Sequence, residues 1–425
     1  MSHFLFASMP SAGHTNPLKP IARALVNAGH TVDWYAGRAF QTAVQATGAA
    51  FLPMHPDLDV APDAQPDRPN LTGLAGIRWD LKHLFLDPVP LQVTELTALV
   101  ALSPPTALVA DMGFVGAAAL HELTGIDWIS VGISPLPVPS RDTAPFGTAL
   151  KPSATPLGRV RNRLLNTLMH RVLLRDVQQH WQRIRARIEL PPTSASPLSG
   201  ISPTLHLQNG VAEFEYPRSD RPAAVRFVGA LTEGPGVPFT PPPWWADVVS
   251  GTRPVVHVTQ GTVANSDLGD LVARTIRVLE DEDVLVVATT GGPDPAVLGD
   301  LPANARAAAF VPHRELLPYT RVMVTNGGYG AVQTALAHGI PLVVAGATED
   351  KPEVAARVEH AGAGVRLKSA APADADLLAA IRRALHEPRL REGADRLRDA
   401  YARIDTEAEI VRLVAGRHAP VEPLL

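Results

Sequence analysis

The amino-acid sequence predicts an α/β protein with two doubly wound domains, and three observations lead to this fold class. The chain has 425 residues, which is more than a single hydrophobic core usually organises. Two segments, 3–37 and 253–291, each show the order strand, glycine turn, helix and strand. Continuous apolar runs recur in both halves, as expected for parallel strands that are buried on both faces.

The two similar segments divide into the same four parts. The first segment begins with an apolar run at 4–7 and a Gly- and Pro-rich turn at 10–16. A helical pattern then extends to about residue 28, and a second apolar run lies at 31–35. The corresponding parts of the second segment lie at 255–258, 260–262, 268–279 and 284–288. Further apolar runs lie at 107–110, 128–132, 322–325 and 341–345. Strands and helices that alternate in this way form βαβ units and parallel sheets.

A Pro-rich stretch separates the two halves. The sequence GPGVP at 234–238 and three prolines at 241–243 can neither continue a helix nor form a central strand. We therefore predict domains at 1–235 and 251–425, joined by a linker at 236–250. A last helical pattern, at 395–415, could close either domain, and its last helix could pack back on the first.

Composition and charge exclude several classes of protein. The apolar fraction of 46% excludes wholesale disorder, and a net charge of -4 gives no sign of nucleic-acid binding. The absence of cysteine excludes disulfides, thiolate metal sites and cysteine nucleophiles. The first residues lack a secretion signal, and no run approaches the roughly 20 apolar residues of a spanning helix. We expect a cytoplasmic chain without a transmembrane segment.

The segment 158–190 is helical in pattern and unusually basic. It carries Arg159, Arg161, Arg163, Arg171, Arg175, Arg183, Arg185 and Arg187. A basic amphipathic helix can contact a membrane surface or cover a lipophilic ligand. A solvated face paired with acidic neighbours is the more common role for such charges. Both interpretations stay open from the sequence.

A glycine-rich turn follows the apolar run at 322–325. It reads Asn326-Gly327-Gly328-Tyr329-Gly330 and precedes a helical pattern at 331–338. Free amides and the positive end of a helix dipole meet at such a turn, which suits a diphosphate. The spacing is neither a dinucleotide fingerprint nor a Walker loop. Taken alone, a tight turn without any ligand is an equally good explanation.

The neighbouring sequence resolves this ambiguity. The stretch FVPHRELLP stands at 310–318 and TEDKPE at 348–353. Together, residues 310–364 resemble the donor-binding signature of family 1, the UDP-glycosyltransferase group with the GT-B fold. The resemblance covers essentially the whole chain. It implies two Rossmann-like domains that face a central cleft, with the acceptor bound by the first and a nucleotide-sugar donor by the second.

The chain departs from that signature at the residues that are expected to contact the diphosphate. Asn326 replaces a histidine before the two glycines, so it can donate a hydrogen bond but cannot carry a charge. The resemblance implies that the backbone around Gly327, Gly328 and Gly330 still supplies donors. Thr262 resembles a ligand of the β-phosphate.

The nucleoside contacts also differ from the family pattern. The ribose-binding glutamate aligns with Thr334, so a weaker contact, or one made by the adjacent Gln333, is expected. The base should lie against Phe310 and the backbone of Val311, with His313 at a position where glutamine is common.

Asp-Lys replaces the Asp-Gln pair that contacts the donor sugar in the family. Asp350 keeps the role of acceptor for a sugar hydroxyl, whereas Lys351 adds a charge that changes the expectation for the sugar. Glu349, beside this pair, and Gly13, beside the histidine described next, are also expected at the donor.

The predicted catalytic base is His14. It follows the first apolar run in the sequence Gly13-His14-Thr15-Asn16-Pro17, which matches the family motif of the general base. A hydroxyl needs such a base near neutral pH, and histidine is the usual side chain for it. Asp111, at the end of the run 107–110, is expected to orient His14, although it could also cap the next helix.

The sequence therefore predicts an inverting glycosyltransferase. It would move a sugar from a UDP- or dTDP-sugar to a hydroxyl of a small, apolar natural product or lipid, with no cofactor and no metal ion. The apolar loops 57–79 and 135–157 would hold that acceptor. Two alternatives stay open: a sugar-nucleotide epimerase, which would convert UDP-N-acetylglucosamine without an acceptor, and a non-catalytic nucleotide-sugar-binding partner protein. No nucleic-acid partner is expected.

Overall fold

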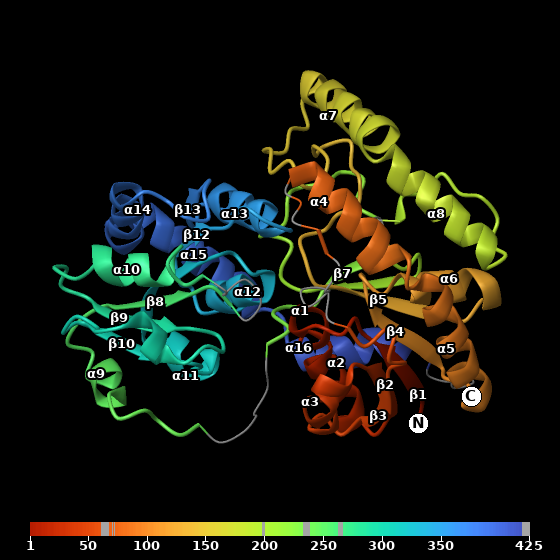
Figure 1. The fold of residues 1–425 in the computed structure, drawn as a ribbon, viewed down its shortest axis with the longest axis horizontal. Helices are drawn as coiled ribbons and strands as arrows, with labels where there is room; N and C mark the ends of the chain where they lie inside the picture. The colour runs from red at the N-terminus through yellow and green to blue at the C-terminus, as the bar shows by residue number, and fades with distance from the viewer. Residues whose placement is uncertain are drawn as a thin grey trace, which may run out of the picture.

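The computed structural model describes residues 1–60, 68–69, 71, 73–197, 200–232, 239–261 and 267–418. These residues form two α/β domains that lie side by side, each with one parallel sheet between layers of helices (Figure 1). The two doubly wound domains expected from the sequence are confirmed.

The first sheet has seven strands in the order β3-β2-β1-β4-β5-β6-β7. Their bounds are β1 His3–Ala7, β2 Thr31–Ala36, β3 Ala50–Pro53, β4 Ala107–Asp111, β5 Trp128–Gly132, β6 Leu205–Gln208 and β7 Val225–Phe227. The winding direction reverses between the parallel neighbours β1 and β4, where Ala7 lies beside Ala110. Open α/β sheets bind ligands at the carboxyl ends of the strands at such a point.

The second sheet has six strands in the order β10-β9-β8-β11-β12-β13. Their bounds are β8 Val255–Thr259, β9 Leu285–Thr289, β10 Ala305–Ala308, β11 Thr320–Thr325, β12 Leu342–Ala345 and β13 Gly364–Leu367. Here the reversal lies between β8 and β11, whose last residues, Thr259 and Thr325, are register partners. Each domain thus has its own switch point.

The helices cover both faces of the two sheets (Figure 1). Those of the first half are α1 Ala12–Thr15, α2 Leu18–Asn27, η1 Arg38–Phe40, α3 Gln41–Gln45, α4 Gly73–Asp80, η3 Leu81–Leu86, α5 Val89–Leu102, α6 Val115–Thr124, α7 Pro156–Leu168, η4 Met169–Leu173 and α8 Arg175–Arg187. Those of the second half are α9 Trp245–Val249, α10 Val272–Val278, η6 Pro295–Leu298, α11 His313–Leu316, η7 Leu317–Tyr319, α12 Tyr329–Ala337, α13 Lys351–His360, α14 Asp374–His386, α15 Pro388–Tyr401, α16 Thr406–Val414 and η8 Gly416–His418.

Alternate residues of each central strand enter opposite apolar layers. Phe4 and Phe6 of β1 belong to one core cluster of the first domain, and Leu5 belongs to another. Val322 of β11 joins one cluster of the second domain and Met323 the other. Side chains of a strand alternate between its faces, so a run of consecutive apolar residues is required when both faces are covered.

The C-terminal helical pattern at 395–415 is two helices, α15 and α16. The break has a local cause, because the side chain of Asp405 accepts a hydrogen bond from the Ala408 amide and caps α16. Helix α16 then leaves the second domain and packs against α2 of the first. Ile410 and Val414 are fully buried in the first domain's core.

The described part of the predicted linker, 239–250, lies on the second domain rather than between the domains. Helix α9 within it buries Val248 in a cluster with Val255 of β8 and Leu285 of β9. Phe239 packs on the same cluster. The apolar and aromatic side chains that follow the prolines explain this packing, and the compact second domain therefore starts before residue 251.

One helical run, Gly73–Leu102, is long and apolar enough to cross a membrane by length and composition alone. It consists of α4, η3 and α5 and bends around the first domain (Figure 1). The side chains of Val89 and Leu96 are fully buried, so α5 serves as a core helix of that domain.

Candidate active site

His14 and Asp111 meet at the switch point of the first sheet. The Nδ1 atom of His14 donates a hydrogen bond to Oδ1 of Asp111 over 2.7 Å. Asp111 ends β4 and is fully buried, whereas the ring of His14 keeps 17% of its surface exposed. Because Nδ1 carries the proton, Nε2 is the basic nitrogen of His14.

The Asp111 carboxylate is held by two further donors. Its Oδ2 accepts a hydrogen bond from the Met9 amide and its Oδ1 one from the Gly113 amide, each over 2.8 Å. These contacts satisfy a buried carboxylate that would otherwise be strongly unfavourable. Helix α6 has Phe114 as its N-cap residue and no side-chain cap, so Asp111 does not cap that helix.

Gly113 lies directly against the His14–Asp111 pair and was not among the residues predicted from the sequence. A Cβ atom at Gly113 would lie 2.6 Å from Cε1 of His14 and 2.9 Å from Oδ1 of Asp111. Only glycine leaves room for the pair at this point. The sequence signal that could have indicated Gly113 is a glycine two residues after an aspartate that ends a strand. His14 itself lies on the single helical turn α1, where a loop was expected.

Asn326 occupies the equivalent place in the second domain, at the end of β11. Its side-chain amide donates to the carbonyl oxygen of Gln260, which follows β8, and its Oδ1 accepts from the Gly328 amide over 3.3 Å. Asn326 thus joins the two strands at the second switch point. Helix α12 begins at Tyr329, two residues earlier than predicted, so Gly328 is its N-cap residue.

Glycines in and around this turn, and Gly13 in the first domain, differ in what surrounds them. Gly327 has a φ of 93°. A Cβ atom at Gly346, just past β12, would lie 1.9 Å from the carbonyl oxygen of Asn326. A Cβ atom at Gly330 or at Gly13 would meet no other atom within 4 Å, so both positions have room for close approach of a ligand.

Gln333 cannot make the predicted ribose contact in this structure. Its side chain is 1% exposed, and its Oε1 accepts a hydrogen bond from the hydroxyl of Tyr401. The inner face of α12 carries Gln333 toward α15, away from the turn. Thr334 lies on the outer face, and its hydroxyl donates to the Gly330 carbonyl over 2.9 Å.

The residues predicted to hold the base follow β10. Phe310 is 61% exposed, whereas Val311 is buried in the core, which leaves the Phe310 ring accessible. His313 begins α11, with its ring 5.9 Å from that of His257. Burial and the nearby His313 lower the pKa of His257 to about 3, so His257 is a neutral core residue. Thr262 lies outside the described residues.

The Asp350-Lys351 pair begins α13. Burial raises the pKa of Asp350 to about 6, against the opposing effects of Lys351 and, across the domains, of His14. Lys351 is buried and its ammonium group pairs with Glu349, whose φ of 55° is unusual for a residue other than glycine.

A buried polar chain anchors α12 on the first domain. The amide of Gln208, at the end of β6, donates to the hydroxyl of Tyr329 over 2.9 Å. That hydroxyl donates in turn to the Asn209 carbonyl over 2.7 Å. Tyr329 is the first residue of α12, so these bonds set the position of the glycine turn relative to the first sheet.

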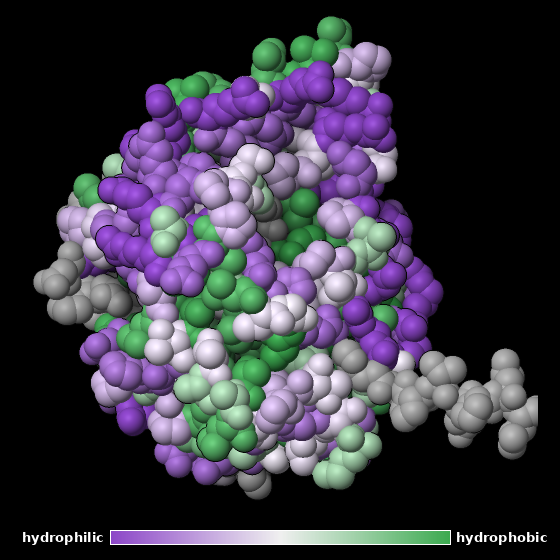
Figure 2. Space-filling view, turned by 90° about the vertical axis from the view of Figure 1, so that its right-hand side faces the viewer, coloured by the Kyte–Doolittle hydropathy of each residue, from purple (hydrophilic) through white to green (hydrophobic). Residues whose placement is uncertain are grey.

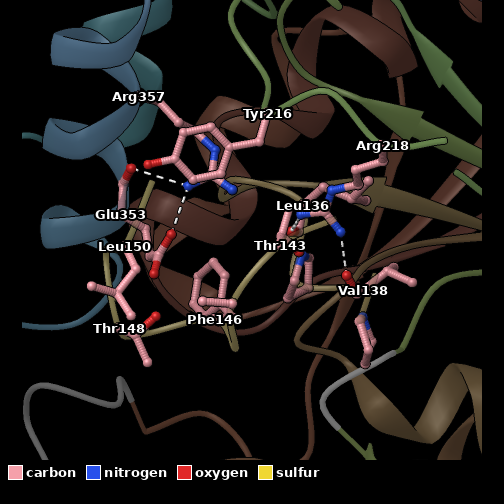
Figure 3. Close-up of a pocket in the computed structure, with 13 residues that line it drawn as sticks. Leu136, Val138, Thr143, Phe146, Thr148, Leu150, Tyr216, Arg218, Glu353 and Arg357 are labelled. Atoms are coloured by element: carbon pink, nitrogen blue, oxygen red, sulfur yellow. Dashed lines mark hydrogen bonds and ion pairs between the residues drawn. The ribbon is translucent and has the colours of Figure 1, made fainter. Parts of the chain in front are cut away.

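A second contact, made of buried charges, anchors α13 (Figure 3). The Arg357 guanidinium donates to Glu215 over 2.6 Å and to Glu353 over 2.7 Å, and it lies 4.2 Å from the centre of the Tyr216 ring. The Glu353 carboxylate also accepts from the amides of residues 147 and 149 over 2.9 and 2.6 Å. Arg357 is 1% exposed. No local sequence pattern predicts this cluster, because Arg357 and Glu215 lie 142 residues apart along the chain.

The described residues contain no group of three or more histidine, aspartate or glutamate side chains arranged to hold a metal ion. Metal independence stays a prediction.

Comparison with known proteins identifies the family. Residues 273–415 match the model of the C-terminal domain of erythromycin biosynthesis protein CIII-like proteins. The 4'-demethylrebeccamycin synthase of Lentzea aerocolonigenes is 47% identical over 418 residues, which cover 97% of this chain and 98% of that protein. UDP-glycosyltransferase 2 of Phaeomoniella chlamydospora is 32% identical, over 95% of this chain and 93% of its own length.

The fold has a counterpart among solved structures. The glycosyltransferase VinC in complex with dTDP superposes with a TM-score of 0.67 at 20% identity, covering 98% of this chain and all of that one. The fold, the relatives and the expectation drawn from the sequence agree, and the chain belongs to the family 1 glycosyltransferases of the GT-B fold.

Proposed function

We propose that this glycosyltransferase transfers a sugar from a UDP- or dTDP-sugar to a hydroxyl of a small apolar acceptor, with inversion at the anomeric carbon. The observation that carries the proposal is the His14–Asp111 pair at the switch point of the first sheet, where the two side chains lie 2.7 Å apart and the imidazole stays partly exposed. An oriented, partly exposed histidine opposite a donor site is the arrangement that single-displacement transfer needs.

In the proposed reaction His14 acts as the general base. Its Nε2 takes the proton of the acceptor hydroxyl while that oxygen forms a bond to the anomeric carbon. The bond from this carbon to the diphosphate oxygen breaks at the same time. Asp111 holds the imidazole in the required tautomer and stabilises the imidazolium that forms.

The departing diphosphate would be received by the amino end of α12. The amides of Tyr329, Gly330 and Ala331 lie in the first helical turn, where the helix itself provides no acceptors. Their dipoles favour negative charge there. Asn326 would contribute by holding the turn in shape, since its side chain already bonds to Gln260 and to the Gly328 amide.

The proposed donor is a nucleoside diphosphate sugar with a pyrimidine base. One relative is named a UDP-glycosyltransferase, and VinC was solved with dTDP. The exposed ring of Phe310 offers a flat apolar face for such a base. Asp350 would accept a hydrogen bond from a sugar hydroxyl.

An apolar acceptor is supported by the surface beside the base. A small hollow in the first domain is lined mainly by apolar side chains, including Met9, Met54, Leu58 and Leu84. Met9 bonds through its amide to Asp111, and the ring of Phe85 lies 6.1 Å from that of His14. Through Met9, this hollow adjoins the carboxylate that orients the base.

The test is transfer with a panel of UDP- and dTDP-sugars and aromatic acceptors, comparing wild type with His14→Ala. We expect the turnover rate to fall by about 10²–10⁴-fold while the dissociation constant of the donor stays within about twofold. The anomeric configuration of the product, read by NMR, should be inverted. Wild-type turnover in His14→Ala would refute the role of the base. Donor binding without transfer or hydrolysis in the wild type would favour a non-catalytic binding protein. A cytoplasmic location is part of the proposal.

A further inference from the structure

The helical segment α7–η4 presents its apolar side chains outward. Leu157, Val160, Leu164, Leu168 and Val172 are 84%, 57%, 64%, 45% and 61% exposed. They are spaced three or four residues apart and therefore share one face of the helix. The segment stands at the upper edge of the first domain in Figure 1, and Figure 2 shows apolar side chains along the upper edge of the molecule.

The inner face of α7 is polar, which is the reverse of an ordinary surface helix. Gly158 and Asn162 are the buried residues of α7. The Asn162 side chain donates to the Arg141 carbonyl over 3.1 Å, and that of Asn166 to the Thr143 carbonyl over 3.2 Å. A helix that stayed only in water would direct its leucines inward instead. This helix is held to the protein by hydrogen bonds and leaves its apolar stripe available.

The same segment is strongly cationic. Between Asp142 and Asp176 the sequence has no acidic residue and six basic ones, at 151, 159, 161, 163, 171 and 175. Among the residues that the structure describes, only Arg159 of these six has an ion pair, with Asp142 over 2.8 Å. Arginines elsewhere on the chain are mostly paired, as Arg277 is with Asp374. The stripe therefore combines apolar side chains with cations that lack acidic partners.

We propose that α7–η4 binds the protein reversibly to the surface of an anionic lipid bilayer. Leucine and valine side chains would enter the boundary between headgroups and acyl chains, and the arginines would contact lipid phosphates. A second copy of the chain fits this surface poorly, because a twofold contact would bring like charges together. This proposal does not depend on the proposed transfer reaction.

The experiment is flotation of the full chain with vesicles of phosphatidylcholine, with and without about 30% phosphatidylglycerol. We expect binding to the anionic vesicles, at least tenfold weaker binding to the neutral ones, and a decrease as salt is added. Arg163→Gln with Arg171→Gln should weaken binding about 30-fold, which corresponds to about 2 kcal/mol for two arginines. Leu164→Ser with Leu168→Ser should weaken it by at least about tenfold.

The matched control is Arg383→Gln with Arg389→Gln. These arginines are exposed, belong to the second domain and both pair with Glu387. This control removes the same charge and should leave vesicle binding unchanged. Equal loss in the control, or equal binding to neutral and anionic vesicles, would overturn the proposal. So would self-association in sedimentation that the leucine variant abolishes, since a second copy would then cover the stripe.

Discussion

Replacement of Arg357 by methionine tests the idea that buried charges hold α13 against the first domain. The variant keeps most of the side-chain volume but removes the cation between Glu215 and Glu353, which lie 2.6 and 2.7 Å from its nitrogen atoms. Burial alone would lower the pKa of Arg357, but the two carboxylates outweigh it and raise that pKa. The arginine is therefore charged at any physiological pH.

The expected loss of stability follows from the contacts that remain. Breaking a buried ion pair by removing one partner costs about 3–5 kcal/mol, because the other charge stays buried. Glu353 keeps its two backbone donors and Glu215 keeps those of Leu136 and Tyr216, so the lower end of that range applies. For a domain of this size, about 3 kcal/mol lowers Tm by roughly 6–12 °C.

The loss should depend on pH. Without the arginine, the pKa of a buried carboxyl group rises above its unfolded value of about 4.3. The folded variant then binds more protons than the unfolded chain, so its stability decreases as pH rises through the raised pKa. The stability difference from wild type should be small at about pH 5 and largest at about pH 8.

Calorimetric melts of wild type, Arg357→Met and the triple variant with Glu215→Gln and Glu353→Gln would measure this. The triple variant should recover part of the loss, because both carboxylates that faced Arg357 are then neutral, and the recovery stays partial because the buried Arg218 loses its partner Glu215. Arg412→Met, which removes an exposed partner of Glu409, should change stability by less than about 1 kcal/mol. A shift for Arg357→Met that matches this control, or that does not vary with pH, would refute the reasoning.

Three further predictions concern the cleft. Asp111→Asn should lower kcat by roughly 10²–10⁴-fold with donor affinity unchanged, because an amide no longer fixes the tautomer of His14; a normal rate in steady-state assays would contradict the pairing. Gly113→Ala should lower kcat by about 100-fold by displacing the imidazole, whereas Gly416→Ala, where a Cβ atom meets nothing within 4 Å, should have no effect in the same assay. Donor affinity should fall about tenfold between pH 7 and pH 5 as Asp350, with a pKa of about 6, takes up a proton. Calorimetric titration of Asp350→Asn should then show a flat pH profile, and a retained pH dependence would assign it to another group.

The sequence was sufficient for the central strands. β1, β4, β8 and β11 are continuous apolar runs because both faces of each sheet are covered. Strands β3, β7, β10 and β13 lie at the sheet edges and were not identified, since one side of each is open and their composition is mixed. Strand β6 reads Leu-His-Leu-Gln, and its buried histidine and glutamine conceal it.

The sequence also placed His14 and Asp111, because His14 lies in the turn after the run 4–7, Asp111 directly follows the run 107–110, and the adjacent strands β1 and β4 bring them together. The sequence could not show that Gln333 is buried away from the glycine turn. The position of a residue along a helix does not reveal which neighbouring element covers its side of the helix. Nor could the sequence reveal the pairing of Arg357 with Glu215, which are 142 residues apart. Local patterns determine strands, turns and the residues at their ends. Contacts between domains depend on how the surfaces of two folded domains fit together, and only the tertiary structure determines this fit.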